Sequence, residues 1–365
     1  MKARLSPGTF ASSVRENLRL RSVSRLLPRL VAFAAIAFSL IWVLFAARNT
    51  NFGPAIDDPK NFFITLLNGL TFAGLLFIVA SGFALIFGLM RVINMAQGVF
   101  FLLGGYIAYD MQQYLADAGG FTPISTDINA WEWLIPALVA TLAIGVFGLA
   151  IQQLLLRWNQ GQDLRQALIT IALSVILADQ IIEHFHGGLG RSVTWPGSIE
   201  KFVDLHVFGI QYSLARLTVL ALGLMVGVLL WLWLYRTRTG MVIRAGVDDR
   251  QMTSALGINI QRTFAIAFFV GSALAGFGGA VGATQAGAAT GADGQWLLNS
   301  LVVVIIGGLG SLLGAAVGSL LYGLVFTFAA VYLPSGYTNY AIVFTFALLA
   351  LVLAFRPQGL IGRPG

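Results

Sequence analysis

The sequence contains no cysteine, and only 10% of its residues are charged. The absence of cysteine excludes disulfides, thiol redox chemistry and cysteine-based metal sites. Soluble domains carry about 25% charged residues. This chain is instead 58% hydrophobic, with a mean hydropathy of +0.83, which indicates an integral membrane protein. Several separate apolar runs, each near the ~20 residues needed to cross a bilayer, indicate that it is polytopic.

Lysine and histidine are also scarce. Only three lysines occur, and none follows a glycine: Lys2, Lys60 and Lys201. The chain therefore has no Walker A phosphate-binding loop. The three histidines fall in one polar stretch, and His184 and His186, two residues apart, do not share a helix face. We expect no cofactor or metal in this chain and no enzymatic activity of its own.

Apolar runs follow one another along most of the chain. We expect spans within these ranges: 31–46, 61–89, 92–109, 133–156, 166–182, 214–235, 263–285, 298–333 and 341–355. The run 298–333 is too long for one crossing and is interrupted by glycines, so it should cross twice or pair a crossing with a re-entrant piece. The predicted fold class is an all-α polytopic membrane protein with about eight to ten transmembrane helices, some of them broken at glycines.

The basic residues are distributed unequally between the two sides of the membrane. If successive runs alternate in direction, most of the 22 Lys+Arg residues fall on one side. Only five fall on the other side: Arg48, Lys60, Arg191, Lys201 and Arg216. The positive-inside rule then places residues 236–262 and the C-terminus in the cytoplasm. The net charge of +7 is explained by topology, so we do not expect nucleic-acid binding.

The chain begins with a polar, basic stretch, 1–30, before a short apolar run, 31–47. That run is either a cleaved signal peptide or a retained signal-anchor span, and the long basic lead favours the span. We expect a cytoplasmic N-terminal extension over 1–30 and an extra span over 31–47. One membrane domain over 61–356 and a cytoplasmic tail over 357–365 should follow.

The segment 236–262 is the longest strongly charged stretch between two apolar runs. Asp248 and Asp249 stand at the start of a short helical pattern, where their side-chain oxygens can cap free amides. Apolar residues then recur at helical spacing before a glycine that ends the pattern: Met252, Ala255, Leu256 and Gly257. Such an amphipathic helix is either a docking site for a cytosolic protein or a helix lying at the lipid headgroups.

A second informative segment, 82–109, combines neutral amides with glycines near the start of a span. The residues concerned are Asn94, Gln97, Gly98, Gly104 and Gly105. Amides beside bare backbone suit a path for a polar solute, but the same residues also serve in hydrogen bonding and close packing between helices. Both interpretations stay open. Glycine-broken segments around 82–105 and 307–323 are typical of transporters with inverted repeats.

Four phrases resemble the permeases of branched-chain amino acid ABC importers, specifically the shorter of the two paired permeases. They are FGLMRVINMAQG (87–98), RAGVDDRQMTSALGIN (244–259), VVIIGGLGSLLGAAVG (303–318) and RPQGLIGR (356–363). The phrases occur in the family's order, and the resemblance covers about residues 61–363. The chain differs from the family's pattern at Gln97, where a histidine is usual, and residues 1–60 have no counterpart in it.

The resemblance implies an importer subunit in the bacterial inner membrane for branched-chain or related amino acids. It would pair with a second permease, two cytosolic ATPases that bind ATP and Mg²⁺, and an extracytoplasmic solute-binding protein. The residues expected to couple to the ATPases are Arg244, Asp248, Asp249, Met252, Leu256 and Gly257. The residues expected along the translocation path are Asn94, Gln97, Gly98, Gly104, Gly105, Gly308, Gly310 and Ser311.

Three other functions remain open. An ion-coupled secondary carrier would use Asp179 and Glu183, four residues apart at the end of a span, as its coupling carboxylates. A passive channel for a small neutral solute would need neither ATP nor a binding protein. An ABC permease for urea or short amides would differ from the first interpretation only in its solute.

Overall fold

The structure is a computed structural model. It describes residues 59–90, 94–117, 128–159, 161–184, 190–204, 209–333 and 336–362. The expected N-terminal extension, 1–30, and the expected first span, 31–47, lie outside the described residues. So do Arg91, within the first family phrase, and Arg363, in the tail.

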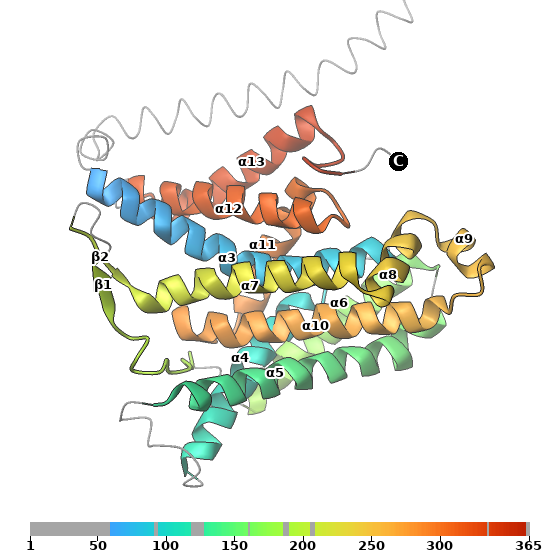
Figure 1. Cartoon of the computed structure of the whole chain (residues 1–365), viewed down its shortest axis with the longest axis horizontal. Helices are drawn as coiled ribbons and strands as arrows, with labels where there is room; N and C mark the ends of the chain where they lie inside the picture. Colours follow the sequence, from blue (N-terminus) through green and yellow to red (C-terminus); the bar gives the residue numbers. More distant parts are fainter. Residues whose placement is uncertain are drawn as a thin grey trace, which may run out of the picture.

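The described chain is almost entirely helical (Figure 1). Its α-helices are α3 (Pro59–Met90), α4 (Gln97–Asp117), α5 (Ala130–Ile151), α6 (Asp163–His184), α7 (Leu214–Arg236), α8 (Arg238–Asp248), α9 (Arg250–Ala255), α10 (Ile260–Gln285), α11 (Ala292–Gly307), α12 (Leu312–Tyr332) and α13 (Ala341–Phe355). A π-helical turn, Gln152–Leu156, and a 3-10 turn, Arg157–Asn159, continue α5. A second 3-10 turn, Thr338–Tyr340, precedes α13.

Seven of the described helices are long and apolar enough to cross a membrane. They are α3, α5 with its continuation, α6, α7, α10, α12 and α13 with its preceding turn. The predicted all-α polytopic membrane protein is therefore confirmed. The long run 298–333 is also divided as expected, into the short α11 and the longer α12, with glycines between them.

Three local expectations were wrong. The span expected over 92–109 begins at Gln97 and continues to Asp117, so Asp110 lies on a helix rather than in a loop. The residues after Asp110 include good helix formers, and Gln112 fixes this end of α4 by exchanging two hydrogen bonds with Thr194.

The loop expected over 183–213 contains a hairpin of two antiparallel strands. β1 (Phe202–Asp204) and β2 (Gln211–Ser213) pair with Val203 opposite Tyr212. The short helix expected from Asp248 is α9, which follows its cap Asp249, but Asp248 itself is the last residue of α8, a helix that was not expected.

Two long helices, α3 and α10, form the centre of the bundle. In their apolar parts 78% and 72% of the residues are buried, against 11% in α6 and 17% in α13. Glycines permit this central contact, since a Cβ on Gly82 would overlap the carbonyl of Gly271. We call the end of the bundle that carries α8 and α9 the α9 end, and the opposite end, near β1 and β2, the hairpin end (Figure 1).

The described helices other than α7, α8 and α9 form two sets with matching neighbours, α3–α6 and α10–α13. α3 packs against α12, as α10 packs against α5. α4 packs against α5 and α10, as α11 packs against α12 and α3. α3 runs toward the α9 end, whereas α10 starts there and runs away from it (Figure 1). Matching neighbours with opposite directions are the arrangement of an inverted repeat.

Candidate functional site

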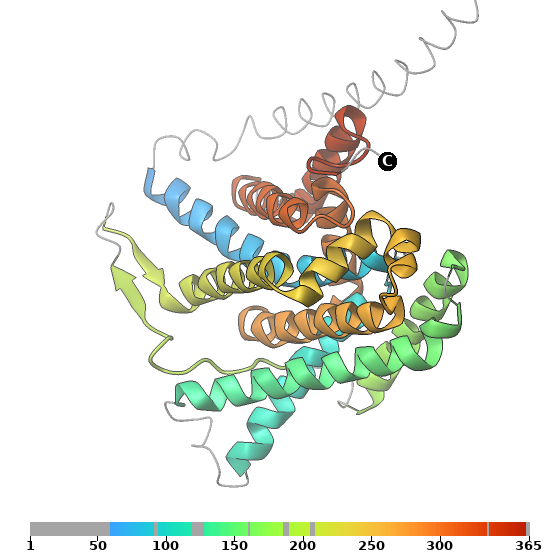
Figure 2. The same ribbon diagram turned by 45° about the vertical axis from the view of Figure 1, so that its right-hand side comes forward.

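α4 begins inside the bundle rather than at its surface. The Gln97 side chain, the first of the helix, is completely buried, and its Nε2 donates to the Gly271 carbonyl at 3.2 Å. Gly271 is in the middle of α10, about 16 Å along the axis from Ile260 at a rise of ~1.5 Å per residue. Figure 2 shows α4 inclined to α5 and α10 as it leaves this position.

The start of α11 meets the start of α4 at the same depth. Gly98 lies directly against the backbone carbonyl of Asp293, so that any side chain at Gly98 would overlap it. The N-terminal end of α4 is therefore in the interior and contacts the first turn of α11, whose Gly294 and Gln295 are exposed on the other side. Helix N-termini carry partial positive charge, and broken helices in transporters direct such ends at solute groups.

The two amides predicted for the path are engaged in hydrogen bonds within the bundle. Asn94 is buried, and its Oδ1 accepts from the backbone N–H of Ala96 at 3.1 Å. Its Nδ2 lies 3.5 Å from Gln97 Oε1. Gln97 thus joins α4 to α10 and to the residues that precede α4. These bonds match the packing interpretation of the two amides, and their contact with a solute stays a prediction.

Gly104 and Gly105 lie where α4 crosses α10. A Cβ on Gly104 would stand 2.5 Å from the Cα of Gly276, and one on Gly105 would stand 3.1 Å from the carbonyl oxygen of Gly279. The absence of side chains therefore lets two backbones touch. Any role of these glycines in a path requires the two helices to separate.

Gly308, Gly310 and Ser311 form the turn between α11 and α12. Gly308 and Gly310 have φ values of +111° and +79°, which disfavour residues with side chains. The Ser311 hydroxyl caps α12 by accepting from the N–H of Gly314 at 3.0 Å. Gly310 packs against Gly88 near the end of α3, so the turn lies at the α9 end rather than beside Gln97.

The C-terminal tail holds this turn in place. The N–H groups of Leu360 and Ile361 donate to the carbonyls of Ile306 and Gly307, each at 2.9 Å. These carbonyls end α11 and have no partner within the helix. The tail thus completes the hydrogen bonding of a helix that ends far away from it in the sequence.

The segment expected to couple to ATPases protrudes from the bundle (Figures 1 and 2). Asp249 caps α9, since its Oδ1 accepts from the N–H of Met252 at 3.0 Å. Gly257, with φ +80°, follows the end of the helix as expected. The side chains of Met252 and Leu256 are 62% and 74% exposed, so this apolar face is not covered by the described chain.

α8 joins this protruding helix firmly to the bundle. Gly240 packs against the backbone of Trp233 and Leu234 in α7, and Gly246 contacts Leu89 at the end of α3. The Arg244 guanidinium carbon lies 4.4 Å from the centre of the Tyr235 ring, a cation–π contact. Asp248, predicted as a cap, is instead the exposed last residue of α8.

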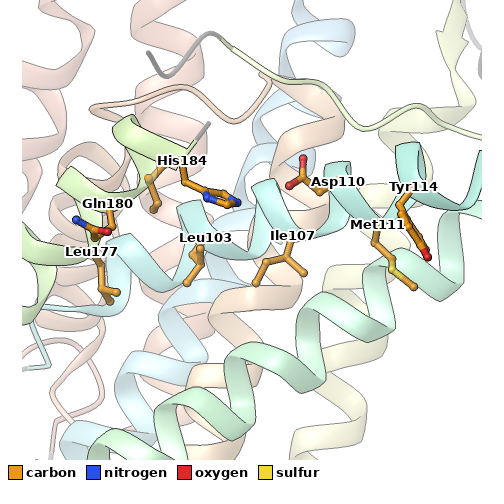
Figure 3. Close-up of a pocket in the computed structure, with 9 residues that line it drawn as sticks. Leu103, Ile107, Asp110, Met111, Tyr114, Leu177, Gln180 and His184 are labelled. Carbon is orange, nitrogen blue, oxygen red and sulfur yellow. The ribbon is translucent and has the colours of Figure 1, made fainter. Parts of the chain in front are cut away.

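An open groove lies between α4 and α6 (Figure 3). It has a volume of about 540 Å³. Its lining includes apolar residues such as Leu103, Ile107 and Leu177, and Asp110 and His184 stand on its rim. The sequence patterns did not predict it, because its two walls are separated by the whole of α5.

The groups that other functions would need are placed unfavourably for them. Asp179 and Glu183 are both exposed on α6, and a buried carboxylate pair is what a proton relay requires. The part of the chain that the structure describes holds no group of three His, Asp or Glu side chains arranged to bind a metal ion.

The sequence patterns also missed several buried polar side chains. The Tyr322 hydroxyl donates to Asn299 Oδ1 at 2.7 Å, which ties α12 to α11. Gln152 is completely buried in the π-helical turn, and Ser272 is completely buried in α10. A polar residue within an apolar run is the signal that could have found them, but burial decides which of these residues matter.

Residues 65–353 match the family "Branched-chain amino acid transport system / permease component". No solved structure matches the chain.

Curated relatives align over most of their length. The chain is 29% identical over 302 residues to the high-affinity branched-chain amino acid transport system permease protein BraD of Pseudomonas aeruginosa. It is 28% and 26% identical to the LivH permease proteins of Salmonella typhimurium and Escherichia coli. Each alignment covers 82% of this chain and 95% of the relative. This chain therefore belongs to the family of permease components of branched-chain amino acid transport systems.

Proposed function

We propose that the chain is a transmembrane subunit of an ATP-binding cassette importer for branched-chain or related amino acids in the bacterial inner membrane. The α9 end faces the cytoplasm, and the chain works with a second permease, two cytosolic ATPases and an extracytoplasmic solute-binding protein. The names of the relatives support the solute class. The feature of the molecule that carries the proposal is the uncovered apolar face of α9, at an end rich in arginine.

The coupling begins at α9. Met252 and Leu256 enter a groove of the ATPase, while the Asp249 cap keeps the short helix formed as it is pushed. A helix of six residues is marginal alone, and its cap is worth about 1 kcal/mol. α9 therefore presents its apolar side chains in one fixed orientation.

Movement then reaches the centre through two connections. α10 follows α9 in the chain, and α8 contacts the end of α3 through Gly246 and Leu89. α3 and α10 are the two central helices, and the inner ends of α4 and α11 abut beside them. Separating these contacts opens the path alternately to each side, with no ATP-binding site in this chain.

The experiment that tests the proposal is affinity purification of the chain from its native membrane. Stoichiometric recovery of a second permease and of ATPases is the expected result. Leu256→Asp should abolish recovery of the ATPases, since it places a charge in an apolar contact. Phe202→Asp, at the hairpin end, is the matched control, because Phe202 is 72% exposed and Leu256 74%.

A transport assay completes the test. The purified complex in vesicles should take up labelled leucine only with ATP and the binding protein. The importer proposal fails if the chain is recovered alone and moves solute without ATP. It also fails if Leu256→Asp leaves ATPase recovery unchanged.

A further inference from the structure

Gln152 is buried in a way that costs stability. Its side chain is 0% exposed, and neither Oε1 nor Nε2 has a hydrogen-bond partner among the described residues. Gln97, equally buried, has its amide nitrogen bound to a carbonyl of α10. An unpartnered buried amide is unfavourable, so its presence calls for a physical reason.

The backbone at Gln152 is also unusual. It is the first residue of a π-helical turn, and its N–H is shared between the carbonyls of Gly148 and Leu149. Single π-helical turns inside α-helices occur frequently at functional sites. The turn widens α5 at a point where it contacts both α6 and α10.

Two further polar atoms without partners come from those neighbouring helices. The Ser272 hydroxyl of α10 is completely buried and lies against Gly148, one helical turn before Gln152 on the same face of α5. Gln166 of α6 is 2% exposed; its Nε2 donates to the Asn159 carbonyl, but its Oε1 has no partner. Three elements thus contribute an uncharged donor or acceptor without a partner: the π-helical turn, α10 and α6.

We propose that Gln152 and Ser272 form a binding position for the polar groups of a zwitterionic solute on the α9 side of the path. This inference rests on the proposed function. The Gln152 Oε1 accepts from the solute's ammonium group, and Nε2 and the Ser272 hydroxyl donate to its carboxylate. Such neutral groups hold a zwitterion weakly enough to release it.

The position is reached only when α5 and α10 move apart. In the present structure the two helices touch at Gly148, where any side chain would overlap Ser272. When α5 and α10 touch, the buried amide has no partner and destabilises this closed state. When they separate, a bound solute supplies the missing hydrogen bonds. A buried glutamine whose only task was packing would instead be bonded to a neighbour, as Gln97 is.

Gln152→Leu distinguishes a role in solute binding from a role in packing. Leucine fills a similar volume but lacks both polar atoms of the glutamine side chain. The midpoint of thermal unfolding should stay the same or rise, since no partner is left unbonded. KM for ATP-driven leucine uptake by the full complex should rise about tenfold, the loss expected for one or two hydrogen bonds. Gln152→Asn should restore part of the affinity. Gln97→Leu is the control, and it should lower the unfolding midpoint because it removes the hydrogen bond that joins α4 to the Gly271 carbonyl of α10.

A labelling experiment keeps the test independent of the ATPases. Because the chain has no cysteine, Gln152→Cys introduces a single thiol. Maleimide should label it in membranes, and added leucine should slow the labelling. If leucine slows labelling but no ATPase is recovered with the chain, the importer proposal is wrong and the binding position stands.

Three results would overturn the inference. One is an unchanged KM in Gln152→Leu. Another is a fall in the unfolding midpoint that equals the fall in Gln97→Leu, which would make Gln152 a structural residue. The third is a thiol at position 152 that is not labelled, or is labelled at the same rate with and without leucine.

Discussion

Gly104→Val tests whether the crossing of α4 and α10 is a packing contact. A Cβ at Gly104 would lie 2.5 Å from the Cα of Gly276, whereas carbon atoms normally approach to about 3.5–4.0 Å. Valine also adds two γ carbons to an already tight contact. The two helices would have to separate by roughly 1 Å or more to accept it.

The expected loss of stability follows from this geometry. Overfilling a packed interior costs about 1–3 kcal/mol, and valine should fall at the upper end because the neighbour is backbone. Valine has a better helix propensity than glycine, which offsets this loss by less than ~0.5 kcal/mol. The net loss of about 2 kcal/mol corresponds to a fall of roughly 3 °C in the unfolding midpoint of a chain of this length.

The assay is thermal unfolding of the purified chain in detergent, beside leucine uptake by the complex. Gly294→Val is the matched control, because a Cβ on that helical glycine has no neighbour within 4 Å, so its midpoint should hardly change. An unchanged midpoint in Gly104→Val, with uptake abolished, would refute the packing account. Gly104 would then face an open path.

Two further predictions concern contacts outside the central crossing. Ile361→Pro removes the N–H that binds the Gly307 carbonyl, so it should lower the unfolding midpoint by about 2–4 °C, and Ile361→Ala, which keeps this N–H, should lower it less. Equal effects of the two variants would contradict the role of the tail. Burial raises the pKa of Tyr212, although the Thr71 hydrogen bond and Arg216 oppose the shift. The folded state therefore favours the neutral phenol, so the free energy of unfolding should fall as the pH rises through the raised pKa. In Tyr212→Phe, which cannot ionise, the free energy of unfolding should fall less at alkaline pH, as measured by circular dichroism.

Patterns along the chain were sufficient for the fold class and for several local features. Apolar runs predicted the long helices, because a span of a bilayer needs a run of fixed length. The cap at Asp249 and the stop at Gly257 were predictable, because helix ends have local chemical requirements. The break between α11 and α12 was marked by its glycines.

The candidate site was predictable only in part. The sequence indicated Met252 and Leu256 as an uncovered apolar face, and the structure leaves both exposed. It left open whether Asn94 and Gln97 line a path or join helices. Only the structure places Gln97 against the Gly271 carbonyl, 174 residues away along the chain.

By itself, then, the sequence determined what depends on neighbours in the chain: the helices, their ends, the sidedness expected from charge and the family. Tertiary structure decided the features that depend on contacts between segments far apart in the chain. It brought the starts of α4 and α11 into contact, bound the tail to the end of α11 and buried Gln152 without a partner. The sequence does not show whether a polar residue in an apolar run has a hydrogen-bond partner, because the partners come from other helices.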